Sequence, residues 1–267
     1  MTKDFEKNTF SKRLKSMLKV DFRRMFTMPL FYIMVGISLV MPILILVMTT
    51  MMDGTVSTNP QTGEETIIEG FKNVWQIIGT ASGESSSIGM SITSMCNINM
   101  LFFLIAVLVC IFVADDFRSG YSKNLFTVRS KKSDYVISKS LVGFVGGASM
   151  LISFFIGSVV GGAIAGLPFD VGTAGVGGII MCMLSKIFLV SIFVSIFLFA
   201  SVFSKQKLWL SILLSLGIGM LFFTMVPMIT PLDSGIINVI LCLVGGAMFS
   251  IIFGYLSTLI LHKRDLY

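Results

Sequence analysis

Six long apolar runs dominate this chain and restrict what it can fold into. They cover about residues 30–50, 98–114, 140–166, 179–203, 208–227 and 236–261. The first run holds 21 residues, which as a helix would measure roughly 32 Å, close to a hydrocarbon core of about 30 Å. Charged residues make up 13% of the chain, against about 25% in soluble domains. We therefore expect an all-α integral membrane protein with six transmembrane helices, forming a single domain over residues 1–267.

The basic residues gather on one side of these runs. Of the 20 Lys and Arg, 18 lie in the N-terminal segment, in residues 115–139, at Lys205 and Lys207, or at the C-terminal end. The opposite side holds only Lys72, and Lys186 lies inside the fourth run. Because Lys and Arg accumulate in cytoplasmic loops, we expect both termini in the cytoplasm. Basic residues beside apolar spans indicate topology and contact with anionic lipid, so no nucleic-acid partner is expected.

Residues 9–28 have the pattern of an amphipathic helix lying in the membrane interface. One stripe is apolar: Phe10, Leu14, Met17, Leu18, Phe22, Met25 and Phe26. The helix is either a simple anchor to anionic lipid or an elbow that also touches a cytoplasmic partner. Asp21 falls in the apolar stripe, where it either pairs with a cation of a neighbouring element or reaches water from the helix edge. Pro29 then turns the chain into the first run.

The first outer loop, residues 51–95, is the one long connection on the side poor in basic residues. A turn cluster at residues 59–65 precedes apolar residues at helical spacing: Ile67, Ile68, Phe71, Val74, Trp75 and Ile78. We expect a short amphipathic helix on the outer membrane surface, with Trp75 at headgroup level. It would either cover the bundle passively or handle substrate.

The third run is rich in glycine. Gly157 and Gly161, and again Gly162 and Gly166, have the small-xxx-small spacing that lets membrane helices approach closely. We expect this packing within the subunit, in preference to a seam between two subunits.

The sequence offers little catalytic chemistry. It has no G-x-x-x-x-G-K-[ST] phosphate-binding loop, no H-E-x-x-H, and His262 as its one histidine. Cys96, Cys110, Cys182 and Cys242 lack metal-ligand spacing, although a bridge between Cys96 and Cys182 is an alternative. We expect no enzyme activity, cofactor or metal in this chain.

Lys186 is the clear intramembrane charge. It either snorkels outward along its helix or faces a polar cavity and contacts an anionic group of a substrate. No embedded Asp or Glu is found of the kind that drives proton- or sodium-coupled carriers, so we expect an energy source outside the chain.

Two segments resemble the type-2 ABC exporter permeases. KVDFRRMFTMPLFY (Lys19–Tyr32) is similar to the family's opening: a basic interfacial helix, an acidic-aromatic-basic cluster and a proline before the first span. The elbow residues are Lys19, Asp21, Phe22, Arg23 and Arg24. FVADDFRSGYSKNLFTVRSKKSDYVISK (Phe112–Lys139) is similar to the family's first cytoplasmic loop, although Tyr121 stands where the family favours Thr.

The resemblance implies a bacterial plasma-membrane permease that acts as a dimer of six-span subunits, two identical copies being favoured over two different ones. Each subunit would dock on a separate cytoplasmic P-loop ATPase, which holds the ATP and Mg²⁺. A coupling helix between spans 2 and 3 would make that contact through Asp115, Asp116, Arg118, Gly120, Lys123, Asn124, Leu125 and Phe126.

By the same resemblance, spans 1, 2 and 5 would line the transport path. Their Met, Phe, Leu and Ile suit a hydrophobic or amphipathic cargo, and we favour exported peptides such as toxins or antimicrobials. A lipid or drug exporter, a secondary carrier or channel, and a sensor or immunity subunit without transport stay open as alternatives.

Overall fold

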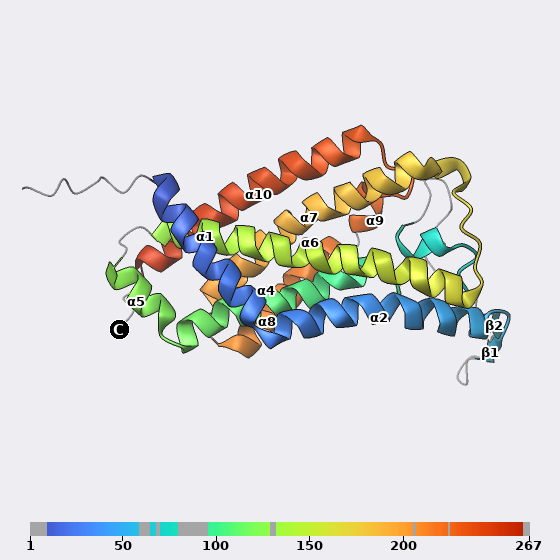
Figure 1. Ribbon diagram of the computed structural model, residues 1–267, viewed down its shortest axis with the longest axis horizontal. Helices are drawn as coiled ribbons and strands as arrows, with labels where there is room; N and C mark the ends of the chain where they lie inside the picture. Colours follow the sequence, from blue (N-terminus) through green and yellow to red (C-terminus); the bar gives the residue numbers. More distant parts are fainter. Residues whose placement is uncertain are drawn as a thin grey trace, which may run out of the picture.

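The computed structural model describes residues 10–58, 65–67, 70–79, 96–128, 132–204, 207–223 and 225–263. The described chain is an elongated helical bundle with one short β-hairpin at its end (Figure 1). Its α-helices are α1 (Phe10–Thr27), α2 (Pro29–Met52), α4 (Leu101–Arg118), α5 (Tyr121–Val128), α6 (Lys132–Ala165), α7 (Gly175–Phe203), α8 (Leu208–Phe223), α9 (Val226–Ile229) and α10 (Ile236–Lys263). Three short 3₁₀ helices are η1 (Val74–Ile77), η2 (Ile98–Met100) and η3 (Gly172–Ala174).

Five helices in the described chain are long and apolar enough to cross a membrane: α2, α4 with its leading turn η2, α6, α7 and α10. They correspond to the predicted spans 1, 2, 3, 4 and 6. In place of the fifth predicted span, 208–227, the structure has α8 with 16 residues, followed by the four-residue α9. A helix of 16 residues measures roughly 24 Å, short of a core of about 30 Å.

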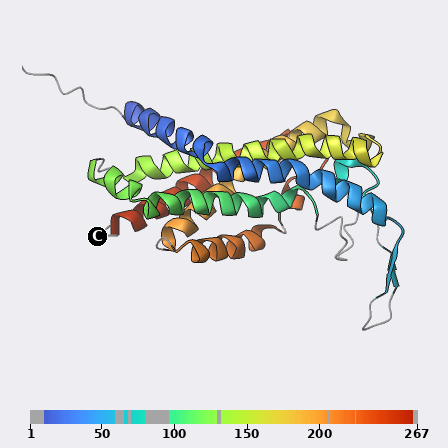
Figure 2. The ribbon, with the colours of Figure 1, turned by 60° about the horizontal axis from the view of Figure 1, so that its bottom comes forward.

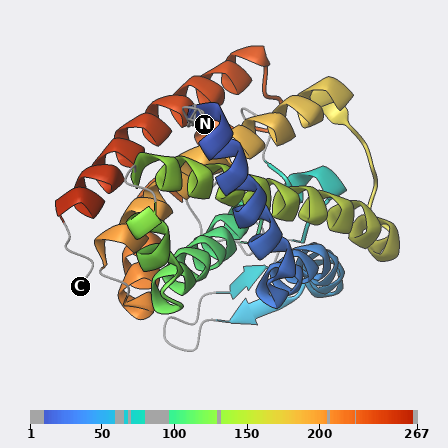
Figure 3. The same cartoon turned by 60° about the vertical axis from the view of Figure 1, so that its left-hand side comes forward.

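Helix α6 is the central element. With 34 residues it is the longest described helix, and it lies between α2 and α10, which occupy opposite sides of the bundle (Figure 3). Its length, roughly 51 Å, exceeds the hydrocarbon core. The predicted loop over residues 115–139 is therefore mostly helical: α4 continues to Arg118, α5 follows, and α6 begins eight residues before the predicted start of span 3.

The packing of α6 against α2 depends on two glycines, Gly157 and Gly161. A Cβ atom at Gly161 would lie 2.7 Å from the Cα of Ile43, and one at Gly157 would collide with the carbonyl oxygen of Leu39. The prediction that these glycines pack helices within one subunit is therefore confirmed. Gly162 instead faces the side chain of Val74, and Gly166 closes α6 with a φ of +68°.

The predicted amphipathic helix of the outer loop is wrong. Ile67 lies in strand β2 (Glu65–Ile67), which pairs antiparallel with β1 (Val56–Thr58), and Ile68 lies outside the described residues. η1 has only four residues, and Phe71, Val74, Ile77 and Ile78 are buried. Trp75 stacks on Phe155 of α6, with 6.1 Å between ring centroids. The helical spacing reflected packing against the bundle, where glycine leaves room, and not a helix lying on lipid.

Two ends of the bundle differ in chemistry. α1, α5 and the end of α10 gather at one end, and the hairpin and η1 lie at the other (Figures 1 and 2). We call the first the basic end, because the described Lys and Arg of α1, of residues 115–139 and of the end of α10 lie there.

Candidate functional site

Helix α1 packs on the bundle through residues one turn apart. Met17, Asp21 and Met25 are buried, whereas Phe10 and Phe26 at the edges of the predicted apolar stripe are largely exposed. The spacing i, i+4, i+8 places the three buried side chains on one line of the helix. An acidic residue therefore sits in the middle of the contact between α1 and the bundle, which is costly unless the acid is paired.

Asp21 is paired. The ammonium of Lys139, from α6, lies 2.9 Å from Asp21 Oδ1, and the hydroxyl of Ser138 donates to Oδ2 at 2.5 Å. Asp21 and Lys139 have essentially no exposed surface. Of the two alternatives for Asp21, pairing with a cation of a neighbouring element is confirmed, and contact with water is wrong.

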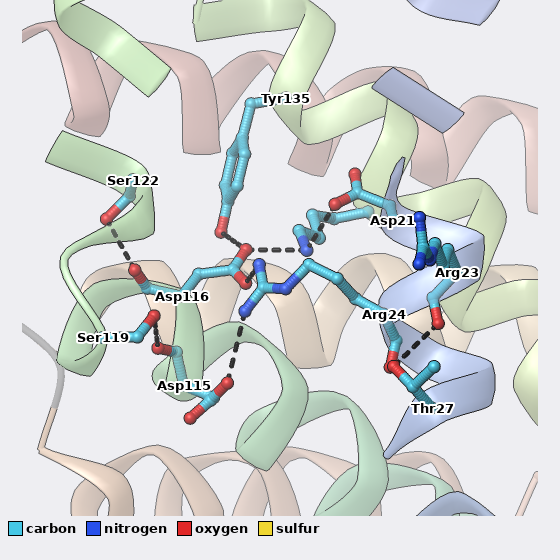
Figure 4. Close-up of polar contacts among 10 residues, drawn as sticks. Asp21, Arg23, Arg24, Thr27, Asp115, Asp116, Ser119, Ser122 and Tyr135 are labelled. Atoms are coloured by element: carbon cyan, nitrogen blue, oxygen red, sulfur yellow. Dashed lines mark hydrogen bonds and ion pairs between the residues drawn. The ribbon is translucent and has the colours of Figure 1, made fainter. Parts of the chain in front are cut away.

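Lys139 also contacts a second carboxylate, on α4. Its ammonium lies 2.6 Å from Asp116 Oδ2, and the hydroxyl of Tyr135 donates to the same oxygen at 2.9 Å. Arg24 of α1 pairs with the other oxygen of Asp116 (Figure 4). One lysine thus bridges two buried carboxylates from different helices, and it also lies 3.8 Å from the ring centroid of Phe112.

The charges of this network balance. Asp21 and Asp116 are offset by Lys139 and Arg24, and the exposed Asp115 adds a contact to Arg24 at 3.2 Å. Burial acts to lower the pKa of Arg24, but Asp116, Tyr121 and Asp115 outweigh it and raise that pKa above its usual value. The guanidinium therefore stays charged at any physiological pH. A neutral, hydrogen-bonded set of buried charges resists being pulled apart, because separation would leave a charge unpaired.

The network also reaches α5. The guanidinium of Arg24 stacks over the ring of Tyr121 at 4.2 Å, and Ser122 donates to the backbone carbonyl of Asp116 at 3.1 Å. Phe126 packs edge-on against Tyr135, with 5.4 Å between centroids. We call Asp21, Arg24, Asp116, Tyr135 and Lys139 the junction, since they join α1, α4 and α6 beneath α5.

The residues predicted to contact an ATPase lie around this junction in different environments. Asp115, Arg118 and Asn124 are exposed, Gly120, Leu125 and Phe126 are half-buried, and the side chain of Lys123 lies outside the described residues. Gly120 has a φ of +73°, which lets the chain turn between α4 and α5. The predicted contact of Asp116 with a partner is wrong, because this residue is fully buried and held by three side chains.

The elbow residues divide in the same way. Lys19 and Arg23 are exposed, Phe22 is half-buried, and Asp21 and Arg24 belong to the junction. A further ion pair, Arg13 with Asp134 at 3.0 Å, joins the first half of α1 to the start of α6. α1 is therefore fastened to the bundle along its length.

Lys186 does not snorkel. It is fully buried in α7, where its ammonium donates to Asn99 Oδ1 and Thr230 Oγ1, both at 2.9 Å. Asn99 lies in η2 and Thr230 directly after α9. The lysine thus ties three elements together toward the end of the bundle opposite the junction, through neutral oxygen acceptors.

The cysteines form neither a bridge nor a metal cluster in the described chain. Its four cysteines are free, so the alternative bridge between Cys96 and Cys182 is wrong. Cys110 contacts the hydroxyl of Ser215 at 3.1 Å, and Cys182 contacts the carbonyl of Thr230 at 3.6 Å. The described residues contain no cluster of His, Cys, Asp or Glu that could hold a metal ion.

Sequence reasoning missed several members of these networks: Tyr121, Ser138, Lys139, Tyr135, Asn99 and Thr230 were not assigned a place in a site. One signal was present. Tyr135, Ser138 and Lys139 share a face of one helix at i, i+3 and i+4. This spacing indicates a polar contact surface if the helix begins several residues before residue 140.

The comparisons add no relative. Protein-family profiles, curated protein sequences and solved structures were each compared with the chain, and none of them matches it.

Proposed function

We propose that this chain is the membrane permease subunit of an ATP-driven exporter of the ABC class. The observation that carries the proposal is the placement of α5. This short helix lies between two membrane-crossing helices, α4 and α6, and the junction fastens α1 to both. A force applied to α5 at the basic end would therefore reach two spans and the interfacial helix together.

The proposal places the basic end in the cytoplasm of a bacterial cell, as the distribution of Lys and Arg indicates. α8 and α9 then form a sixth, interrupted crossing between α7 and α10, and both termini lie on the cytoplasmic side. A separate P-loop ATPase supplies ATP and Mg²⁺, contacts Arg118, Asn124 and the exposed side of α5, and favours one of two permease states by binding it better. Two copies of the chain form the pathway.

The cargo in this proposal is an amphipathic molecule, and we favour a peptide. α2 carries a continuous apolar exposed face, including Tyr32, Ile33, Val40, Leu44 and Met48. A strongly hydrated ion or sugar would leave polar groups unpaired against such a surface. A lipid or drug is the alternative cargo.

A secondary carrier is the second candidate function, because Lys186 is a buried ionisable group inside a membrane-crossing helix. Such groups often mark an ion or substrate pathway. The two functions differ in their energy source. Transport into inside-out vesicles that needs ATP and the ATPase supports the exporter, whereas transport driven by an ion gradient alone contradicts it.

The test of the exporter uses the chain expressed with the products of neighbouring genes. We expect a P-loop ATPase to co-purify, with ATP hydrolysis stimulated by an amphipathic peptide. The double variant Arg118→Glu, Lys123→Glu should lose most of that ATPase or its stimulation, because charge reversal at a charged contact is repulsive. Lys207→Glu, an exposed reversal elsewhere at the basic end, is the matched control. Equal recovery and stimulation in both variants would contradict contact through α5.

A further inference from the structure

An apolar groove opens along the side of the bundle, away from the junction. α6 forms one wall between Ser133 and Phe144, α10 forms the other between Gly246 and Thr258, and Phe188 and Ser191 of α7 form the floor. Its volume is about 740 Å³, within the range of roughly 300–1,000 Å³ found for small-ligand sites. Ile251 and Tyr255 on its rim are largely exposed, so the groove is open to the surroundings of the helices.

Three of the hydroxyl groups that line this groove add little polarity to it, because they are satisfied within the protein. Ser191 donates to the carbonyl of Phe188 at 2.7 Å, and Thr258 donates to that of Gly254 at 2.9 Å. Ser250 shares a hydrogen bond with Ser195 at 2.9 Å. What the groove offers to a ligand is therefore hydrocarbon surface, which suits a flexible apolar chain.

The groove has about the length of one membrane leaflet. Its α6 wall begins at the basic end and extends over eleven residue steps, or roughly 16 Å, about half of a 30 Å hydrocarbon core. Dividing the volume by this length gives a mean section of about 45 Å². A mean section of this size accommodates an extended acyl chain along the whole length of the groove.

The end of the groove at the membrane surface is cationic. Lys132 precedes the lining residue Ser133, and its ammonium donates to the carbonyl of Leu261 at the end of α10, at 2.6 Å. His262 lies one turn beyond Thr258 on the same face of α10, and Lys263 follows it; both are exposed. The nearby Asp134 is neutralised by Arg13. An ammonium has three donors, so Lys132 can bond a phosphate oxygen in addition to Leu261.

We propose that this groove binds an anionic glycerophospholipid of the leaflet at the basic end. One acyl chain lies between α6 and α10, and the phosphate sits against Lys132, with His262 and Lys263 beside it. The acyl chain accounts for the narrow apolar section, and the phosphate accounts for the cations at the mouth. The bound lipid fills a gap in the packing of α10, whose spanning stretch is the least buried of the five membrane-crossing helices in the described chain.

The test is lipid retention, measured without nucleotide or ATPase and so independent of the proposed transport. The protein is reconstituted in nanodiscs of equal phosphatidylglycerol and phosphatidylethanolamine, released into mild detergent, and examined by native mass spectrometry. We expect one phosphatidylglycerol retained per chain. Gly254→Leu should reduce retention at least tenfold, because a Cβ there meets only Val136, at 3.7 Å, and the side chain fills the groove.

Gly36→Leu, on α2 with nothing within 4 Å of its Cβ, is the matched control and should retain the lipid. Ile251→Trp at the exposed rim is a second blocking variant if Gly254→Leu folds poorly.

Lys132→Gln should keep a lipid but lose most of the preference for phosphatidylglycerol. Unchanged retention in both blocking variants, or an anionic preference unaffected by Lys132→Gln, would overturn the proposal. So would a dimer that the blocking variants dissociate without loss of lipid, because the groove would then be an interface between copies.

Discussion

Lys139 is the residue on which the junction depends. Its ammonium is shared by Asp21 and Asp116, so each of these buried carboxylates relies on a cation supplied by a third helix. Removing one member of a buried ion pair costs far more than the pair contributes, since the partner is left charged and dehydrated. The effect of a substitution here should depend on which charges remain.

Lys139→Met should lower the free energy of unfolding by about 3–5 kcal/mol, because the two buried carboxylates would then share a single remaining cation, Arg24. Asp21→Asn added to Lys139→Met should cost much less than Asp21→Asn alone, or restore stability, since it removes an unpaired charge. Thermal unfolding in detergent measures both, with the exposed Lys19→Met as a control of the same chemistry. Additive effects of the two substitutions would show that Asp21 and Lys139 are not coupled.

Lys186 makes a different kind of contact, because its acceptors are neutral. Asn99→Leu should cost about 1–3 kcal/mol or more, since it removes an acceptor from a buried ammonium. Lys186→Met should cost less, because only the amide of Asn99 loses its partner, while Thr230 keeps its bond to the Val226 carbonyl. The same unfolding assay compares them. A larger loss in Lys186→Met than in Asn99→Leu would favour an unseen anionic partner for the lysine.

At the scale of elements, the contact between α2 and α6 is set by backbone approach. A Cβ at Gly161 meets backbone atoms of Ile43, which cannot rotate away, whereas a Cβ at Gly162 meets the side chain of Val74. Packed interiors respond to such overlap by shifting whole helices. The glycine spacing in the third run therefore predicted a close approach of helices within the subunit, but not that α2 is the partner.

Gly161→Ala should lower the free energy of unfolding by about 1–3 kcal/mol through overpacking. Gly36→Ala, on the same pair of helices but with open space around its Cβ, should be neutral or stabilising by roughly 0.5–1 kcal/mol. Denaturant or thermal unfolding of the two variants provides the comparison. If both alanines are tolerated equally, the close approach of α2 and α6 is not what holds these helices together.

For the whole molecule, local sequence patterns predicted the spanning helices, whereas contacts between distant segments could be predicted only in kind. The apolar runs predicted the five spanning helices. The position of Asp21 in an apolar stripe predicted, as one alternative, that this acid is paired, because a buried charge needs a partner wherever it lies in the fold. The identity of that partner, Lys139, could not be predicted, since it lies 118 positions away. The prediction of a helix in the outer loop is wrong because the same apolar spacing suits both a surface helix and a segment packed on Gly162. The predicted contact of Asp116 with an ATPase is wrong because a polar residue near a loop can be buried when a distant segment supplies the opposite charge.

In the proposed exporter the basic end, with the junction and α5, faces the cytoplasm, where an ATPase can reach it. This placement is tested most directly by cysteine labelling in a background without Cys96, Cys110, Cys182 and Cys242. Thr55 beside the hairpin and Ser119 at the end of α4 are both exposed and suit the purpose. We predict that a membrane-impermeant maleimide labels Thr55→Cys in intact cells and labels Ser119→Cys only after permeabilisation. Labelling of Ser119→Cys but not Thr55→Cys in intact cells would place the basic end outside and contradict the account.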